Sequence, residues 1–190
     1  IKREANYLNY LVEELLILGQ LDSDGFNIKR KNIKLNDLIE FALASKQKEI
    51  NTKNLTIQKD LEDENVKINV DPNKFKEVFL NIIENAVKYS PKGKLLKISS
   101  DHTYNKNNNL EEIKIKISDQ GEGIPEDKKD KIWKRFYKLD EARTRDDKKS
   151  SGLGLSIVKE IINQHQGKVW VESKEGTGSK FGFSLPQVEN

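Results

Sequence analysis

Residues 1–22 have the hydrophobic pattern of one amphipathic helix. Its apolar positions recur at spacings of three and four, and they are Leu8, Leu11, Val12, Leu15, Leu16 and Leu18. This stripe is typical of a helix in a bundle or coiled coil, because an isolated helix of this length is only marginally stable in water. The polar turn at 22–25 ends the helix, which predicts a separate unit at 1–22 and a domain at 26–190. The alternative is that the helix packs on that domain.

After this turn, stretches of alternating apolar and polar residues are interspersed with stretches of helical periodicity. Strands are predicted at 26–35, 55–61, 66–70, 95–100, 113–119, 167–173 and 179–186. Helices are predicted around 38–43, from Asp71 onward, and over 155–166. Strands and helices that mix at such short intervals favour a single α/β domain, in which helices cover one face of a mixed sheet.

The helix predicted from Asp71, with Pro72 at its first position, has two unlike faces. At 100° per residue its buried face holds Phe75, Phe79, Ile82, Ile83 and Ala86. The opposite face holds Lys74, Glu77, Asn81, Asn85 and Lys88. Asparagine is a poor helix former, so this polar stripe suggests a ligand: amide oxygens suit a hard cation, and lysine suits an anion such as phosphate. A solvated helix face would give the same pattern.

Three glycine motifs follow. Asp119 to Ile124, "DQGEGI", ends an apolar strand, where a carboxylate can accept from an exocyclic amine and glycines let the backbone approach a planar ligand. At Gly152, "GLGLSIVKEII" opens a helix whose free N–H groups and positive dipole end favour phosphate. The last is "GTGS" at 176–179. Each motif alone also fits an ordinary loop, helix start or hairpin turn.

Composition excludes several classes of protein. The chain has 34 basic and 31 acidic residues, well mixed along the sequence, which disfavours a nucleic-acid binder. With no cysteine there is no disulfide or thiolate chemistry. No stretch approaches the run of about 18 apolar residues that a membrane span needs. Because the chain starts at Ile1, we expect a fragment, whose membrane attachment would lie in missing segments.

Taken in order, the motifs resemble the N, G1, F, G2 and G3 boxes of the histidine kinase catalytic domain, in the superfamily of gyrase, the Hsp90 chaperones and MutL. The resemblance runs from about Phe26 to Pro186 and rests on "NIIENAVKYSP", "DQGEGIP", "IWKRFYK", "GLGLSIVKEI" and "GTGSKF". It implies a Bergerat-type ATP-binding fold, a two-layer α/β sandwich of a mixed sheet with helices on one face. The 1–22 segment resembles the second helix of the dimerisation and histidine-phosphotransfer domain.

The resemblance also implies ligands for ATP and Mg²⁺. Asn85 would bind the metal, Lys88 would touch phosphate, Tyr89 would lie near the ribose or adenine, and Asp119 would accept from the adenine amine, with Ser179 sharing a water beside it. Gly121, Gly123 and Ile124 would shape the base pocket, while Gly152, Leu153, Gly154 and Leu155 would meet the phosphates. The segment between Trp133 and Ser151 looks like the mobile lid over the nucleotide, with Trp133, Phe136 and Tyr137 as its apolar anchor.

The catalytic residues implied are Asn81, Lys138 and Arg143. The ATPase relatives have a water-activating glutamate where this chain has Asn81, so efficient hydrolysis is not expected. Glu84 lies about 80° away around the helix and is not a convincing general base. Lys138 stands where the F box usually has arginine, for which Arg143 or Arg145 would compensate. Ser150 and Gln166 also replace usual glycines.

Neither His102 nor His165 lies on a helix before the catalytic domain, so we expect the acceptor histidine upstream of Ile1. The sequence therefore predicts the ATP-binding domain of a sensor histidine kinase, cytoplasmic within a membrane-anchored protein. Its expected partners are a response regulator and, through the helix bundle, a second copy. The alternatives are a serine kinase of the anti-sigma-factor type and a degenerate nucleotide sensor.

Overall fold

The computed structural model describes residues 28–105, 110–139 and 151–187, together with Val12, Leu16 and Gly19. Those three isolated residues are helical, and the side chains of Val12 and Leu16 are exposed. The rest of the predicted N-terminal helix, and the boundary proposed after it, lie outside the described residues. No helix in the described ranges combines the length and apolar character that crossing a membrane requires.

Helices and strands alternate along the chain much as predicted. The helices are α2 (Leu35–Ser45), α3 (Gln47–Thr52), α4 (Pro72–Tyr89) and α5 (Gly154–Gln164), with short 3-10 turns η1 (Glu126–Lys128) and η2 (Lys131–Trp133). The strands are β1 (Lys31–Lys34), β2 (Thr56–Leu61), β3 (Lys67–Val70), β4 (Leu95–Asn105), β5 (Leu110–Ser118), β6 (Lys168–Lys174) and β7 (Gly178–Pro186). The helix α3 and both 3-10 turns have no counterpart in the prediction.

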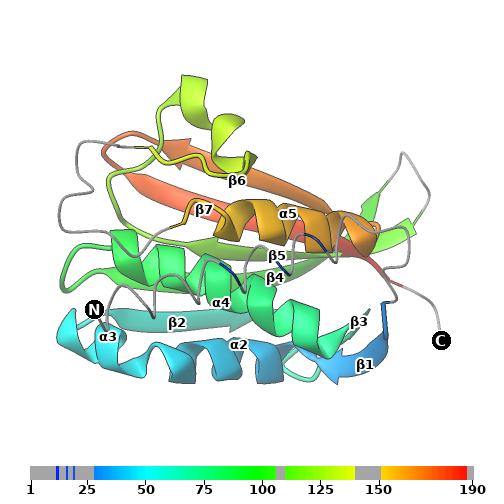
Figure 1. Cartoon of the computed structure of the whole chain (residues 1–190). Helices are drawn as coiled ribbons and strands as arrows, with labels where there is room; N and C mark the ends of the chain where they lie inside the picture. The colour runs from blue at the N-terminus through cyan, green and yellow to red at the C-terminus, as the bar shows by residue number, and fades with distance from the viewer. Residues whose placement is uncertain are drawn as a thin grey trace.

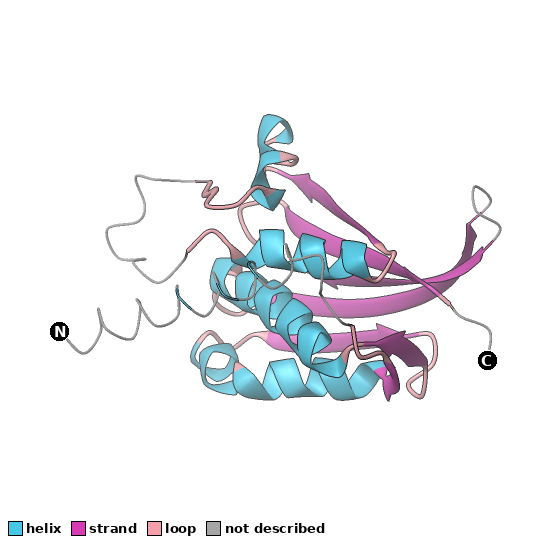
Figure 2. Cartoon of the chain, turned by 45° about the vertical axis from the view of Figure 1, so that its right-hand side comes forward, coloured by secondary structure: helices cyan, strands magenta, loops and turns pink. Residues whose placement is uncertain are grey.

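The main sheet has five strands in the order β2-β4-β5-β7-β6. Strands β2 and β4 are parallel, and the other pairs are antiparallel. The helices α2, α4 and α5 lie on one face of this sheet (Figures 1 and 2). The predicted α/β sandwich is therefore confirmed. Strands β1 and β3 pair with each other in a separate small sheet, a partnership that the hydrophobic pattern alone does not specify.

The core lies between the sheet and the helices. Strand β5 points Ile113, Ile115 and Ile117 into it, all at 0% exposure. The helix α4 contributes Phe79, whose ring meets that of Phe183 edge-on at 5.7 Å between centroids. The five residues predicted for the buried face of α4 are all at most 1% exposed. The two-faced character of this helix is thus confirmed, and its asparagine stripe lies away from the sheet.

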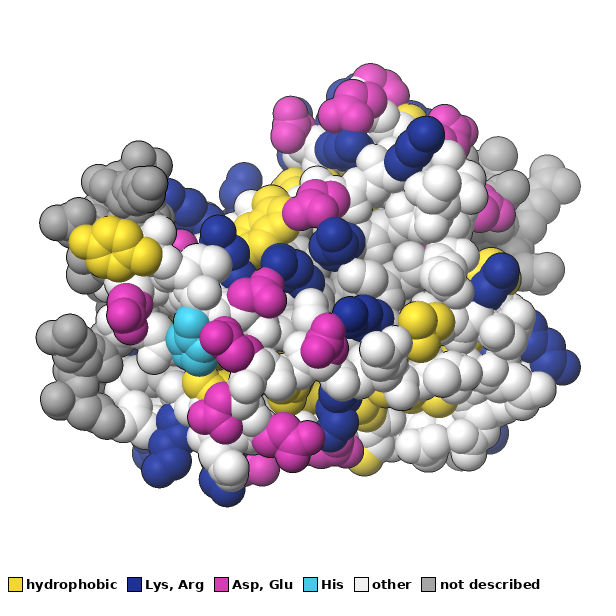
Figure 3. Space-filling model, turned by 180° about the vertical axis from the view of Figure 1, so that it is seen from behind, with side chains coloured by type: hydrophobic (Ala, Val, Ile, Leu, Met, Phe, Trp, Pro, Cys, Tyr) yellow, Lys and Arg dark blue, Asp and Glu magenta, His cyan; other side chains and the backbone are white. Residues whose placement is uncertain are grey.

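The other face of the sheet is covered by charged side chains of both signs, which interleave over the surface seen in Figure 3. Ion pairs cross it at Lys97–Asp60, Lys116–Asp101 and Lys180–Glu172. Among them, the ring of Trp170 lies directly over Gly182, where an added Cβ would fall 2.3 Å from the ring atom Cε2. A glycine at this position leaves room for the indole against β7.

Candidate nucleotide-binding site

The polar stripe of α4 forms one wall of the candidate site. The helix begins at the N-cap Asp71, whose side chain accepts from the backbone N–H groups of Asn73 and Lys74, with Pro72 in the first turn, as predicted. Further along, Asn81, Asn85 and Lys88 are half-buried.

The beginning of α5 lies against this stripe. A Cβ added to Gly154 would fall 2.5 Å from Oδ1 of Asn81, so the glycine lets the helix start lie closely against the asparagine amide. Just before it, the hydroxyl of Ser151 accepts from the backbone N–H of Leu153 at 3.0 Å. The predicted asparagine motif and the predicted phosphate-binding glycine motif are therefore in direct contact.

Asp119 lies at the end of β5 and is 8% exposed. Its Oδ1 accepts from the backbone N–H of Gly121 at 2.8 Å and from that of Ser179 at 3.3 Å. Burial raises the pKa of the Asp119 carboxyl above its ordinary value, while these N–H donors act in the opposite direction. Both of these hydrogen bonds use Oδ1. Among the hydrogen bonds of the described residues, Oδ2 is therefore the carboxylate oxygen left for a ligand.

Close backbone contacts join this loop to its neighbours. A Cβ added to Gly121 would fall 2.6 Å from the carbonyl oxygen of Tyr89, at the end of α4. Gly123 has a φ of 76°, and its Cβ would fall 2.2 Å from the carbonyl oxygen of Lys174. Neither position accommodates a side chain, so the loop after β5 is held between the end of α4 and the β6–β7 turn.

The aromatic anchor also reaches the glycine motif. Trp133 meets Phe181 edge-on at 6.1 Å between ring centroids. Phe136 has a φ of 62°, which is unusual for a bulky residue, and is 60% exposed. A Cβ on Gly152 would fall 2.9 Å from the backbone carbon of Phe136. The F box and the glycine motif that precedes α5 are therefore adjacent.

Several predicted site residues can meet a ligand only in a limited way. The side chains of Ile124 and Leu153 are in the core, at 5% and 0% exposure, which leaves the backbone as the part of Leu153 that could reach phosphate. Ser179 reaches Asp119 through its backbone N–H.

The other predicted site residues differ in how the structure places them. Lys138 and Leu155 are half-buried. Arg143, Arg145 and the part of the predicted lid from 140 to 150 lie outside the described residues. Glu84 forms an ion pair with Lys46 on the exterior.

One site residue was missed. The hydroxyl of Ser173 accepts from the backbone N–H of Ile124 at 2.8 Å, donates to the carbonyl of Gly178 at 2.8 Å and lies 3.0 Å from the hydroxyl of Ser179. It thus ties the loop after β5 to the β6–β7 turn. The available signal was that Ser173 continues the alternation of Val169 and Val171, which places a polar residue on the inward face of β6.

The donors fit a metal that is held mainly by its nucleotide. In the described ranges, no three His, Cys, Asp or Glu side chains come together as a metal cluster. Mg²⁺ commonly uses one or two protein oxygens together with substrate phosphates, and the amide oxygen of Asn85 on the polar stripe suits that arrangement.

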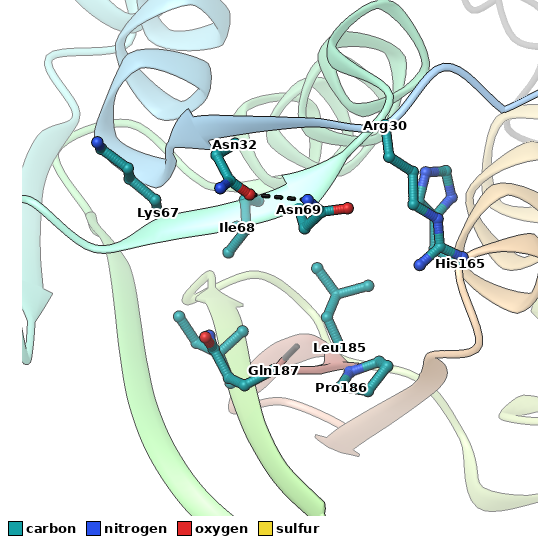
Figure 4. Close-up of a pocket in the computed structure, with 10 residues that line it drawn as sticks. Arg30, Asn32, Lys67, Ile68, Asn69, His165, Leu185, Pro186 and Gln187 are labelled. Atoms are coloured by element: carbon teal, nitrogen blue, oxygen red, sulfur yellow. Dashed lines mark hydrogen bonds between the residues drawn. The ribbon is translucent and has the colours of Figure 1, made fainter. Parts of the chain in front are cut away.

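A separate hollow lies away from these motifs (Figure 4). It is lined by Asn32, Lys67 and Asn69 of the small sheet, by Arg30 just before β1, and by His165 at the end of α5. Since α5 begins at Gly154, this hollow is at the opposite end of that helix from the candidate site. None of the predicted site residues lines it.

The sequence profile of the histidine kinase-, DNA gyrase B- and HSP90-like ATPases matches residues 70–189, which include the asparagine stripe and all three glycine motifs. The chain belongs to this family. Its likeness to the sensor protein kinase WalK of Staphylococcus aureus is 36% identity over 187 residues, or 97% of this chain. The chain spans only 29% of the length of that relative. Within the family, it is an ATP-binding catalytic domain of the histidine kinase type.

Solved structures of this family have the same fold. The catalytic domain of the histidine kinase ThkA has a TM-score of 0.71 and 27% identity, over 85% of this chain and 99% of that one. ThkA in complex with the response regulator protein TrrA has a TM-score of 0.76 and 26% identity, over 98% and 49% of the two chains. Full-length ShkA, solved in complex with AMPPNP, has a TM-score of 0.81 over 97% of this chain and 36% of that one, and its 20% identity supports the fold alone.

Proposed function

We propose that the chain is the catalytic part of a two-component sensor histidine kinase, which transfers the γ-phosphate of ATP to a histidine outside this chain for relay to a response-regulator aspartate. The observation that carries this proposal is the contact of Gly154 with Asn81 and of Gly121 with Tyr89, since these contacts bring the separate motifs to one site. The likeness to WalK supports the same assignment and extends over almost the whole chain.

The proposed site binds the nucleotide at both ends. Asp119 accepts from the adenine amine, with Gly121 and Gly123 shaping the base pocket and Tyr89 beside it. Lys88 and the backbone from Gly152 to Leu155 hold the phosphates at the positive end of α5. Asn85 holds Mg²⁺, which neutralises phosphate charge when it is bound. Asn81, in contact with Gly154, orients these groups.

Transfer is favoured over hydrolysis because neither Asn81 nor Glu84 on α4 suits the activation of water. An amide such as that of Asn81 does not take up a proton, and Glu84 is exposed and paired with Lys46. Phosphoryl transfer needs mainly positioning and charge stabilisation. We assign the stabilising charge at the γ-phosphate to Lys138 and Arg143.

The acceptor belongs to another segment or chain. His165 is 1% exposed, and both of its ring nitrogens contact backbone atoms, those of Asp71 and Ile161. His102 lies on the strand β4 and pairs with Glu62. Neither histidine has the accessible helical setting of the family's acceptor. The chain has two histidines in all, so the acceptor must come from elsewhere.

The segment before the domain supplies the means of assembly in this proposal. Residues 1–22 are the second helix of the dimerisation and phosphotransfer hairpin, with the catalytic domain over 26–190. Val12 and Leu16 in its apolar stripe are exposed and available to a bundle partner. A response regulator as partner is supported by the ThkA–TrrA complex, and membrane anchoring would come through segments outside this chain.

The test separates binding from transfer. Titration calorimetry should show that this chain binds Mg-ATP. With γ-labelled ATP, the chain alone should stay unlabelled, whereas label should appear on an added chain that is extended by its natural upstream sequence and disabled by Asp119→Asn. The label should be acid-labile, as expected of a phosphohistidine. Absence of nucleotide binding would refute the proposal, and acid-stable label on this chain alone would favour the serine-kinase alternative.

A further inference from the structure

The end of α4 is held by a residue that no motif includes. The last four carbonyl groups of a helix lack partners within the helix. In α4 these belong to Ala86, Val87, Lys88 and Tyr89. The backbone N–H of Ser90 donates to the carbonyl of Ala86 at 3.1 Å. The next two carbonyls are bound by one side chain, that of Lys53.

The ammonium group of Lys53 makes three hydrogen bonds to this helix end. Its Nζ donates to the carbonyl oxygens of Val87 at 2.8 Å, Lys88 at 2.6 Å and Ser90 at 2.9 Å. These use all three donors of a lysine, and a positive charge at a helix C-terminus is favourable to the helix dipole. Burial lowers the pKa of Lys53, which agrees with an ammonium partly withdrawn from water into this ring of carbonyls.

Lys53 is itself well anchored. It caps the C-terminus of α3, and its backbone N–H donates to the carbonyl of Glu49 at 3.0 Å. Its own carbonyl accepts from Gly93 at 2.8 Å, in the turn that follows α4. Backbone and side chain together therefore tie the α3–β2 connection to the α4–β4 connection.

The part of the chain that Lys53 holds borders the candidate base pocket. It fixes the backbone of Lys88, whose side chain lies over the ring of Tyr89 with Nζ 5.0 Å from the centroid. The remaining carbonyl, that of Tyr89, lies against Gly121. Gly121 in turn donates its N–H to Asp119. A shift of the helix end would therefore pass directly to the loop that places the Asp119 carboxylate.

We propose that Lys53 is a positioning residue for nucleotide binding, which sets the end of α4 and, through Tyr89 and Gly121, the base pocket. This inference rests on the proposed function, because it assumes that the nucleotide occupies the site between these motifs. Lys53 acts through backbone groups and does not itself touch the ligand.

The test compares two lysines that contact α4. Lys53→Met keeps the aliphatic stem and removes the three donors, and it should raise the dissociation constant for Mg-ATP about tenfold, as loss of a group that orients ligand-binding residues does elsewhere. Lys46→Met removes only an exposed ion pair with Glu84 and should stay within about twofold of the parent chain. If Lys53→Met does not fold, Lys53→Gln takes its place. Glutamine keeps N–H donors but not the charge, and it should also raise the dissociation constant for Mg-ATP.

A further variant separates positioning from stability. Asp71→Ala weakens the opposite end of α4, so it should lower the melting temperature and leave Mg-ATP affinity unchanged when measured on fully folded protein. In nitrogen-proton NMR spectra, Lys53→Met should shift the amide signal of Gly121, while Asp71→Ala should not. Equal loss of affinity in these two variants, or parent-like affinity in Lys53→Met, would overturn the inference. If the parent chain binds no Mg-ATP, it is the proposed function that fails.

Discussion

Nε2 of His165 accepts a hydrogen bond of 3.1 Å from the backbone N–H of Asp71, so the residue after α5 contacts the residue before α4. The other ring nitrogen, Nδ1, is 2.8 Å from the carbonyl oxygen of Ile161 and is therefore the one that carries hydrogen. Through this neutral imidazole, the two helices that bear the candidate site are joined at their far ends.

This geometry predicts a loss of stability on acidification. Burial lowers the pKa of His165 from its ordinary value of 6.5; Arg30 lowers it further, while the Ile161 carbonyl and Asp71 act in the opposite direction. At a pH below this ordinary pKa, His165 binds a proton in the unfolded chain but stays neutral in the folded chain until the pH reaches its lower folded-state pKa. The contribution of His165 is therefore fully present above about pH 6.5 and is lost as the pH falls toward the folded-state pKa.

Urea unfolding between pH 5 and pH 7.5 measures this effect. His165→Gln provides the comparison, because the amide oxygen of glutamine can accept from Asp71 without titrating. The variant should lose less stability on acidification than the parent chain. Parallel curves for the two proteins would show that His165 makes no such contribution.

The N-cap residue of α4 should contribute more to the free energy of unfolding than an ordinary surface carboxylate does. Besides capping the helix, Asp71 accepts from the backbone N–H of Lys29 through Oδ2 at 3.1 Å. Asp71→Ala is expected to lower the free energy of unfolding by about 1–2 kcal/mol. Asp127→Ala, which removes an exposed pair with Lys131, should cost less than about 0.5 kcal/mol. Chemical denaturation at pH 7 compares the two, and equal losses would argue against the capping role.

The metal ligand is tested by comparing nucleotide binding with and without Mg²⁺. If the amide oxygen of Asn85 holds the ion, Asn85→Ala should weaken Mg-ATP binding far more than ATP binding measured in EDTA. Calorimetric titrations under both conditions give the ratio. The same loss in both would assign Asn85 a structural role in α4.

Two glycines with the same backbone conformation distinguish close packing from backbone strain. Gly123 and Gly176 have φ values of 76° and 79°, but an added Cβ would meet the carbonyl oxygen of Lys174 at Gly123 and nothing within 4 Å at Gly176. Both alanine variants carry a strain of about 1 kcal/mol. Only Gly123→Ala should lower the free energy of unfolding by about 1–3 kcal/mol more than this strain. It should also bind the nucleotide more weakly. Similar melting temperatures for the two variants would contradict this.

Sequence reasoning succeeded where the signal is local. The period of Phe75, Phe79 and Ile82 specifies the buried face of α4, and Asp71 with Pro72 specifies where the helix begins. Gln166, which stands where a glycine is usual, has a φ of 63° and so adopts the conformation that a glycine would favour. These features depend on residues within a few positions of one another.

What the sequence did not predict depends on distant pairings. Strand β1 pairs with β3, where Ile33 lies opposite Ile68. Several strands have a similar hydrophobic pattern, so the pattern does not specify which of them pair. The roles of Ser173 and Lys53 come from backbone groups that they meet only after folding, at Ile124 and at the end of α4. Lysine and serine are common on protein surfaces, so these residue types do not by themselves predict such contacts.

The indole that lies over Gly182 has a practical consequence for optical measurements. The chain has two tryptophans, and they lie in different surroundings: Trp170 on the outer face of β6, and Trp133 in the F box against Phe181. Replacing Trp170 with phenylalanine would leave Trp133 as the sole indole fluorophore. Its emission would then follow events near Phe136 and Gly152 in real time, without any attached dye.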